Sequence, residues 1–190
     1  MAQRTQLRRI ASVAFSASQV ISTQLPVSGR IRGLMLELSG TLDITGAGGT
    51  SIARNPGTLA PSLTLFKNRQ EVLKQGRWVD WRDRNGVFNR LPNEDATGVA
   101  IAADTFRSRI YLPFLTPWGR NPIDTVLDIK PEDRLDLDLQ WGSADNLLSG
   151  GTKSLTTGLA VAPTVDVIAE VSSWDPPPIA MYKENGFDSA

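Results

Sequence analysis

The chain has 190 residues, of which 41% are hydrophobic and 21% charged, and its 20 basic and 20 acidic residues leave no formal net charge. This length and composition are typical of one globular domain that buries a core without a disulfide or a structural metal. Cysteine and histidine are both absent, which excludes disulfides, thiolate nucleophiles, imidazole metal ligands and Ser-His-Asp or Cys-His catalytic sites.

The first part of the chain is basic. The first acidic residue is Glu37, and five arginines precede it: Arg4, Arg8, Arg9, Arg30 and Arg32. We expect residues 1–18 to form a basic N-terminal arm that contacts lipid, nucleic acid or an acidic neighbour; the alternative is a solvated terminus. Within this arm, residues 5–14 show a weak helical pattern.

The sequence shows no membrane span or signal peptide. No run of about 18 apolar residues occurs. Residues 10–20 carry three serines and a glutamine, which makes them too polar for the core of a signal peptide. We therefore expect a product that is made and kept in a cytoplasm until it assembles.

Alternating apolar and polar residues predict strands in the first half of the chain. The first candidates are residues 19–27 and a long strand over residues 34–44. Gly40 interrupts the long strand and permits a bulge or a corner there. A short strand over residues 62–66 is followed by residues 68–75, where good helix formers predict a short helix.

A segment dense in arginine, tryptophan and aspartate comes next. Residues 78–81 are predicted as a strand and Asn85-Gly86 as a hairpin turn. Arginine and tryptophan are enriched in protein interfaces, so we expect four residues of this segment to contact a partner: Arg77, Trp78, Trp81 and Arg82. The other interpretation is an ordinary hairpin with partly buried rings.

The second half of the chain repeats the strand pattern, with candidates over residues 99–102, 106–115, 134–141 and 164–174. Pro113 cannot donate a ladder hydrogen bond, so its strand is expected to end there or to lie at a sheet edge. Glycine- and proline-rich loops are expected over residues 46–61 and 118–122.

Eight candidate strands with turn-rich connections predict an all-β, antiparallel, jelly-roll-like sandwich with one or two short helices and extended termini. We expect the domain to cover residues 19–174. Residues 175–190 are expected to form a C-terminal arm that reaches neighbouring molecules. Consecutive prolines there remove ladder donors and favour an extended chain: Pro176, Pro177 and Pro178.

Neither a phosphate-binding loop nor a metal site is supported. The glycine-rich residues 46–51 lack the lysine and the following helix that a phosphate-binding loop requires. Asp124, Asp128 and Asp133 are too sparse for a calcium loop. We expect no cofactor and no metal.

Two carboxylate pairs, Asp80 with Asp83 and Asp136 with Asp138, bring glycosidase chemistry to mind. Asp136 and Asp138 share one strand face about 7 Å apart. They alternate with leucines, however, so a solvated strand face is the expected explanation. We therefore expect that the protein is not an enzyme.

The chain carries five tryptophans: Trp78, Trp81, Trp118, Trp141 and Trp174. Tryptophan rings bind sugars by stacking and also anchor protein interfaces. Trp141 falls on the apolar face of its strand, so core packing is predicted for it.

The order of the segments resembles the single jelly-roll capsid proteins of tailless double-stranded DNA phages with an internal membrane, and the N-terminal jelly roll of related double-jelly-roll coats. The resemblance covers about residues 19–174 and rests on the succession of residues 19–27, 31–38, 63–68 and 110–114 and the late alternating strands. It implies upright strands in an icosahedral shell, pseudo-hexagonal capsomers and termini that tie neighbours together. No residue role is carried over.

We therefore expect a structural virion protein that assembles into an icosahedral shell with copies of itself, as a homo-oligomer, and with other coat proteins. The alternative is a carbohydrate-binding or receptor-binding sandwich that uses exposed tryptophans such as Trp78 or Trp118. A third hypothesis, a carboxylate-only glycosidase, requires two acidic groups that face each other across a cleft.

Overall fold

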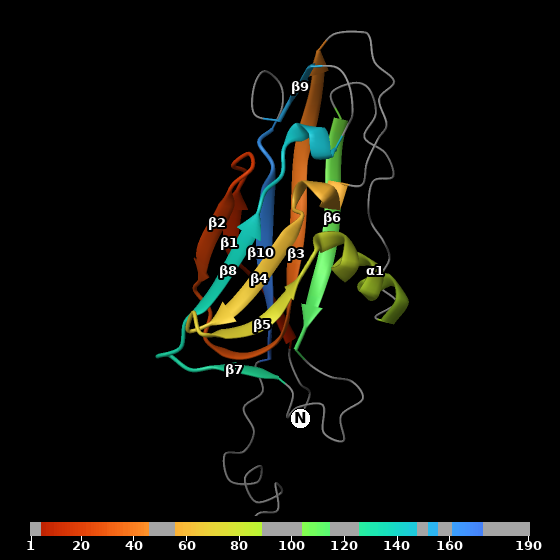
Figure 1. Cartoon of the computed structure of the whole chain (residues 1–190). Coiled ribbons are helices and arrows are strands. Elements are labelled where there is room, and N and C mark those ends of the chain that lie inside the picture. The colour runs from red at the N-terminus through yellow and green to blue at the C-terminus, as the bar shows by residue number, and fades with distance from the viewer. Residues whose placement is uncertain are drawn as a thin grey trace, which may run out of the picture.

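The computed structural model describes residues 5–45, 56–88, 104–114, 126–147, 152–155 and 161–172. These residues form a sandwich of two antiparallel sheets with one α-helix at its side (Figure 1). Neither this helix nor any other helix in the described ranges has the length and apolar content needed to cross a membrane.

The six-stranded sheet, sheet A, contains β1 (Thr5–Ala14), β3 (Gly29–Thr45), β6 (Asp104–Pro113), β7 (Leu127–Ile129), β9 (Thr152–Ser154) and β10 (Thr164–Ser172). The four-stranded sheet, sheet B, contains β2 (Val20–Leu25), β4 (Ser62–Lys67), β5 (Glu71–Gly76) and β8 (Leu135–Gln140). The helices are α1 (Trp78–Phe88) and the short 3₁₀ turns η1 (Pro56–Leu59) and η3 (Ala144–Asn146).

The strand order is that of a jelly roll. Sheet A runs β1-β10-β3-β6 and sheet B runs β2-β8-β4-β5. The eight long strands therefore pair as a rolled hairpin: β4 with β5 at its tip, then β3 with β6, β2 with β8, and β1 with β10. This nesting of antiparallel pairs confirms the predicted all-β jelly-roll sandwich.

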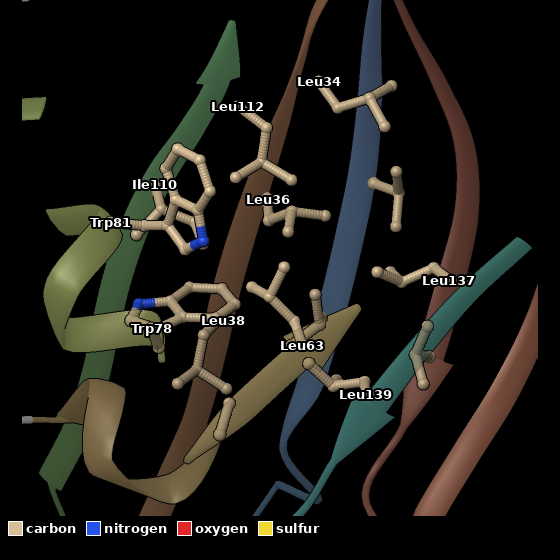
Figure 2. Close-up of a cluster of buried hydrophobic side chains, with 14 of the residues drawn as sticks. Leu34, Leu36, Leu38, Leu63, Trp78, Trp81, Ile110, Leu112, Leu137 and Leu139 are labelled. Atoms are coloured by element: carbon tan, nitrogen blue, oxygen red, sulfur yellow. The ribbon is translucent and has the colours of Figure 1, made fainter. Parts of the chain in front are cut away.

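The core lies between the sheets and follows the alternation of the strands. In β3 the even-numbered leucines are fully buried: Leu34, Leu36, Leu38 and Leu42. Sheet B meets them with Leu63, Leu137 and Leu139 (Figure 2). Each fully buried leucine stabilises the fold by about 1.5–3 kcal/mol relative to an exposed one, which is why the period-two pattern predicted the strand faces correctly.

Residues 5–14, predicted as a weak helix within a basic arm, form the edge strand β1, so the helical prediction is wrong. Ten residues of the segment expected as an arm lie in sheet A. Val13 is fully buried and stands opposite Val165 of β10. Pairing with a strand near the other end of the chain outweighs the weak local preference for helix.

Residues 68–75, also predicted as a helix, instead form the turn and second strand of the β4–β5 hairpin. Asn68 and Arg69 both have positive φ, 53° and 57°. Two successive left-handed residues are typical of the type I′ turns that join antiparallel strands. Glycine is the usual residue at the second of these positions, and this turn has Arg69 there instead. The sequence therefore gives no glycine signal for the turn.

Residues 78–81, predicted as a strand, and the predicted hairpin turn at Asn85-Gly86 both lie in α1, so these two predictions are wrong. Trp78, Trp81 and Asn85 are buried and recur at spacings of three and four residues. This spacing places them on one helical face, which packs against β6 and the core.

The remaining strand predictions agree with the structure where it describes them, except for the candidate over residues 99–102, which lies outside the described residues. β6 ends at Pro113 and is the edge of sheet A, as predicted. The pairing of β3 with β6 runs through Gly40 without a shift of register. The expected bulge is therefore absent from this ladder; a Cβ at Gly40 would lie 2.7 Å from Phe106 Cζ, so close packing explains the glycine.

Candidate interaction surfaces

Helix α1 closes one side of the sandwich. It packs along β6, the edge strand of sheet A, on the side opposite β1 and β2 (Figure 1). The Trp78 Nε1–H donates to Ser108 Oγ at 2.9 Å, and both residues are fully buried. Asn85 Nδ2 donates to the Tyr111 carbonyl at 2.8 Å, and the Tyr111 N–H donates to Asn85 Oδ1 at 2.5 Å. The helix thus supplies hydrogen bonds that a further strand would otherwise make.

The two tryptophans expected to contact a partner belong to this helix. Trp78 is 0% exposed and Trp81 is 8% exposed, and their rings point toward the leucines of β3 (Figure 2). The other interpretation of the sequence, an ordinary hairpin with partly buried rings, is wrong as well, because the segment is helical and both rings are buried. A ring that is already enclosed by its own subunit cannot anchor another molecule.

A basic corner lies beside Trp81. Lys74 Nζ lies 5.9 Å from the centroid of the Trp81 ring and 5.7 Å from that of Phe114, and Arg84 Cζ lies 5.3 Å from the Trp81 centroid. Burial of the ammonium group, and to a smaller extent the Arg84 charge, lowers the pKa of Lys74. Two cations on one aromatic ring can receive an acidic group of a partner.

Ion pairs cover the outer face of sheet A near β1. Arg9 Nη2 lies 2.7 Å from Asp166 Oδ1, and Ser12 donates to the same oxygen at 2.8 Å. Arg8, the other described arginine of the expected basic arm, is exposed. The structure therefore engages Arg9 within the subunit and leaves the Arg8 side chain accessible.

A groove of about 580 Å³ runs along the outer face of β3 and β6. Glu37 lies in it and pairs with Arg107 and Arg109 at 2.8 and 2.6 Å. Phe106 and Val161 contribute apolar surface. Glu37 is the one carboxylate among the described lining residues, so the groove as described does not hold the facing acidic pair that a glycosidase requires.

Tyr111 lies across Gly33 on the same face. The ring occupies the space that a Cβ on Gly33 would need. The Tyr111 hydroxyl donates to Glu170 Oε2 at 2.5 Å, and Arg32 lies 3.5 Å from the other oxygen of that carboxylate. Burial, together with this hydrogen bond to an anion, raises the pKa of Tyr111.

Sheet B carries a buried charge cluster where the sequence predicted a solvated face, so that prediction is wrong for Asp136. The Asp136 side chain is 0% exposed and lies 3.2 Å from Arg69 Nε and 2.8 Å from Arg134 Nε. Arg69 also donates to Asp138 at 2.9 Å and to Ser22. The guanidinium groups cover the carboxylate because Arg69 reaches over from the β4–β5 turn.

Two ion pairs lie at the start of α1. Arg77 donates twice to Asp80, at 2.9 and 2.8 Å, and Arg82 lies 2.8 Å from Asp83. Each carboxylate of the Asp80 and Asp83 pair therefore meets its own arginine. Of the two arginines predicted to contact a partner, Arg77 just before the helix is 69% exposed and Arg82 within it is 20% exposed.

Asp133 has the carboxyl group with the largest described pKa shift. It accepts from Asn68 Nδ2 at 2.9 Å and from the Lys130 N–H at 3.1 Å, and Lys67 Nζ lies 3.1 Å away. The Asn68 hydrogen bond, followed by the other two contacts, lowers the pKa of Asp133 to about 2. The described residues contain no cluster of three acidic side chains that could hold a metal ion; Asp124 lies outside them.

The remaining predicted contact residues, Arg4 and the three prolines Pro176, Pro177 and Pro178, lie outside the described residues, as do Trp118 and Trp174. Trp141 is 1% exposed and meets Phe15 edge to face at 5.3 Å between ring centroids, as predicted for a core residue. All three described tryptophans are therefore buried.

Comparison with solved structures supports the fold assignment. The chain is similar to the STIV MCP, with 15% sequence identity, a match that covers 88% of this chain and 48% of that chain, and a TM-score of 0.60. It is similar to PBCV-1 VP54 fitted into the virophage Sputnik, with 14% identity, coverage of 95% of this chain and 45% of that chain, and a TM-score of 0.62. It is also similar to the PBCV-1 virus capsid, with 14% identity, coverage of 97% of this chain and 44% of that chain, and a TM-score of 0.60. No protein-family model matches the chain, and no curated protein does.

These solved structures are viral major capsid proteins with jelly-roll folds. At identities of 14–15% the likeness establishes a shared fold and assigns no residue a role. The chain spans less than half the length of each of these proteins. It corresponds in size to a part of such a coat protein, and it folds as the jelly-roll sandwich that the sequence pattern predicted.

Proposed function

We propose that this chain is a structural virion protein that assembles with copies of itself, and with other coat proteins, into an icosahedral shell. The observation that supports it most is the complete jelly-roll order of eight strands, shared over 88–97% of the chain with viral capsid proteins. The virion is the corresponding location.

The residue chemistry agrees with a structural role. The chain holds no cysteine and no histidine. The carboxylates of the candidate surfaces lie in ion pairs rather than in a facing pair: Asp136 and Asp138 share Arg69, and Glu37 is held by two arginines. We propose on this basis that the protein is not an enzyme.

The basic first strand and the proline-rich C-terminal segment are proposed as contacts to neighbours. Arg8 is exposed on β1, which suits an anionic partner such as lipid, nucleic acid or an acidic coat protein. Pro176, Pro177 and Pro178 favour an extended chain that can reach across a subunit boundary.

The carbohydrate-binding alternative has no support among the described residues. It requires exposed tryptophan rings, and Trp78, Trp81 and Trp141 are 0%, 8% and 1% exposed. Stacking on a sugar needs an accessible ring face.

The proposed function is tested by sedimentation velocity and electron microscopy of the purified full-length chain at increasing concentration. We expect concentration-dependent oligomers and, at high concentration, ordered plates or closed shells. A glycan array serves as the comparison. A chain that remains monomeric at millimolar concentration and binds a defined glycan would refute the proposal and favour the carbohydrate-binding alternative.

A further inference from the structure

The sandwich has four long edge strands, and three of them carry features that prevent pairing with another strand. An open edge presents free N–H and C=O groups, which natural proteins protect with bulges, charges, proline or a covering element. The edges of sheet A are β1 and β6, and those of sheet B are β2 and β5.

β6 is covered by α1, whose Asn85 bonds both backbone groups of Tyr111, and it ends at Pro113. β1 has a register shift between Arg9 and Ala11 and carries charged residues. β5 also has a register shift, opposite Leu65 and Phe66, and carries charged residues as well.

Within the part of the chain that the structure describes, β2 has none of these features. Its six residues, Val-Ile-Ser-Thr-Gln-Leu, contain no charge, glycine or proline. Its register with β8 runs from Val20 to Leu25 without a shift. It lies beside β1 along the side of the sandwich that α1 leaves open (Figure 1).

The hydrogen-bond pattern between β2 and β8 determines which backbone groups of β2 point away from the sheet. The Trp141 N–H donates to the Gln19 carbonyl at 2.7 Å, and bonded and non-bonded pairs alternate along an antiparallel ladder. The N–H and C=O groups of Val20, Ser22 and Gln24 therefore point away from β8. The side chains of these three residues are also exposed.

We infer that β2 is an assembly edge that pairs antiparallel with β2 of a second copy of this chain about a twofold axis. The three outward-pointing residues are spaced symmetrically about Ser22. A twofold placed there bonds Ser22 to its counterpart and Val20 to Gln24 of the other copy, and it joins two four-stranded sheets into one of eight. Because β2 itself is uncharged, its own side chains bring no like charges together, whereas two β1 strands would oppose Arg8 and Arg9. The charged groups that contact Ser22, Arg69 and Asp138, are paired with each other within each copy.

This inference rests on the proposed assembly function and is tested separately from it. Gln24→Pro removes an N–H that points away from β8, so the fold keeps its own ladder while the paired edge loses two symmetry-related hydrogen bonds. We expect the dimer dissociation constant to rise about ten- to hundredfold. Gln24→Val keeps the N–H and is the matched control, with an unchanged dissociation constant; thermal unfolding checks that both variants fold.

A cysteine at the proposed axis tests the register directly, because the chain has no cysteine of its own. Directly paired bonded residues place their Cα atoms about 5.5 Å apart, which a disulfide spans. Ser22→Cys should therefore form a covalent dimer under mild oxidation. Val20→Cys should not, since the two Val20 positions are about 13 Å apart in this register.

The outcomes separate the two proposals. Oligomers that persist unchanged in Gln24→Pro, with no Ser22→Cys dimer, would overturn the β2 pairing and leave the coat-protein proposal standing. A chain that is monomeric at every concentration would overturn both. Equal disulfide yield from Ser22→Cys and Val20→Cys would indicate random collision and would also overturn the proposed register.

Discussion

Asn85 of α1 holds Tyr111 of β6 with both ends of its side-chain amide. Nδ2 donates to the Tyr111 carbonyl at 2.8 Å, and Oδ1 accepts the Tyr111 N–H at 2.5 Å. These are the two hydrogen bonds that a paired residue of another strand would provide. A helix side chain thus satisfies the sheet edge and blocks the addition of a strand there.

Replacing this amide should destabilise the fold. We expect Asn85→Ala to lower the free energy of unfolding by about 1–3 kcal/mol, because two backbone groups at a buried contact lose their partners. Urea denaturation measures the effect. Val87→Ala on the same helix, at a residue that is 73% exposed, should change stability by less than about 0.5 kcal/mol. Equal stabilities of the two variants would contradict the proposed role of Asn85.

The buried ion pair of sheet B should be coupled energetically. Arg69 adopts a left-handed conformation, with φ 57°, and covers Asp136. We expect Arg69→Ala to cost about 2 kcal/mol, less than the loss of an isolated buried pair because Arg134 remains. A double-mutant cycle with Asp136→Asn should give a coupling of at least about 1 kcal/mol.

The matched control for that cycle is the exposed pair Arg77 and Asp80, whose side chains are 69% and 45% exposed. Solvent screens this pair, so its cycle should show no measurable coupling. If both cycles gave the same coupling energy, the burial of Asp136 would have no energetic role.

Asp133 should make stability depend on pH in the acid range. Its folded pKa of about 2 lies below the ordinary value of 3.8, so its contribution is present above the unfolded pKa and is lost as the pH falls toward 2. We expect the stability difference between the parent and Asp133→Asn to be constant from pH 7 to about 5 and to shrink below that. Urea denaturation at several pH values measures it. A difference that is independent of pH would contradict the lowered pKa.

Gly33 should be intolerant of a side chain because the Tyr111 ring covers it. Gly33→Ala forces the ring away and breaks the hydrogen bond to Glu170, at an expected cost of about 1–3 kcal/mol. In a Tyr111→Ala background the same change should cost much less, since the obstructing ring is gone. A penalty that is equal in both backgrounds, measured by thermal unfolding, would place its origin in the backbone instead.

The strands that sequence could predict are those with one buried face. In β8, Leu135, Leu137 and Leu139 alternate with polar residues, and all three are buried. The sequence does not predict which strands pair with each other, because pairing joins segments that are far apart in the chain. β1 illustrates this: its residues have no clear alternation, and its place beside β10 depends on a partner near the C-terminal end.

The interaction surfaces were harder to predict because they depend on side chains that meet only in the folded protein. Asp136 looks like a solvated strand residue until Arg69 reaches it from another hairpin. One signal was present in the sequence: Trp78, Trp81 and Asn85 follow a helical spacing. That spacing predicts a buried helical face rather than an exposed hairpin.

Electron cryo-microscopy of particles purified from the cells in which this gene is naturally expressed tests the coat-protein role most directly. We expect the shell to contain this two-sheet sandwich at one set of symmetry-equivalent positions. The side that carries β1 and β2 should face a neighbouring subunit. A shell without density for it, together with the chain recovered as free monomers, would contradict the role proposed here.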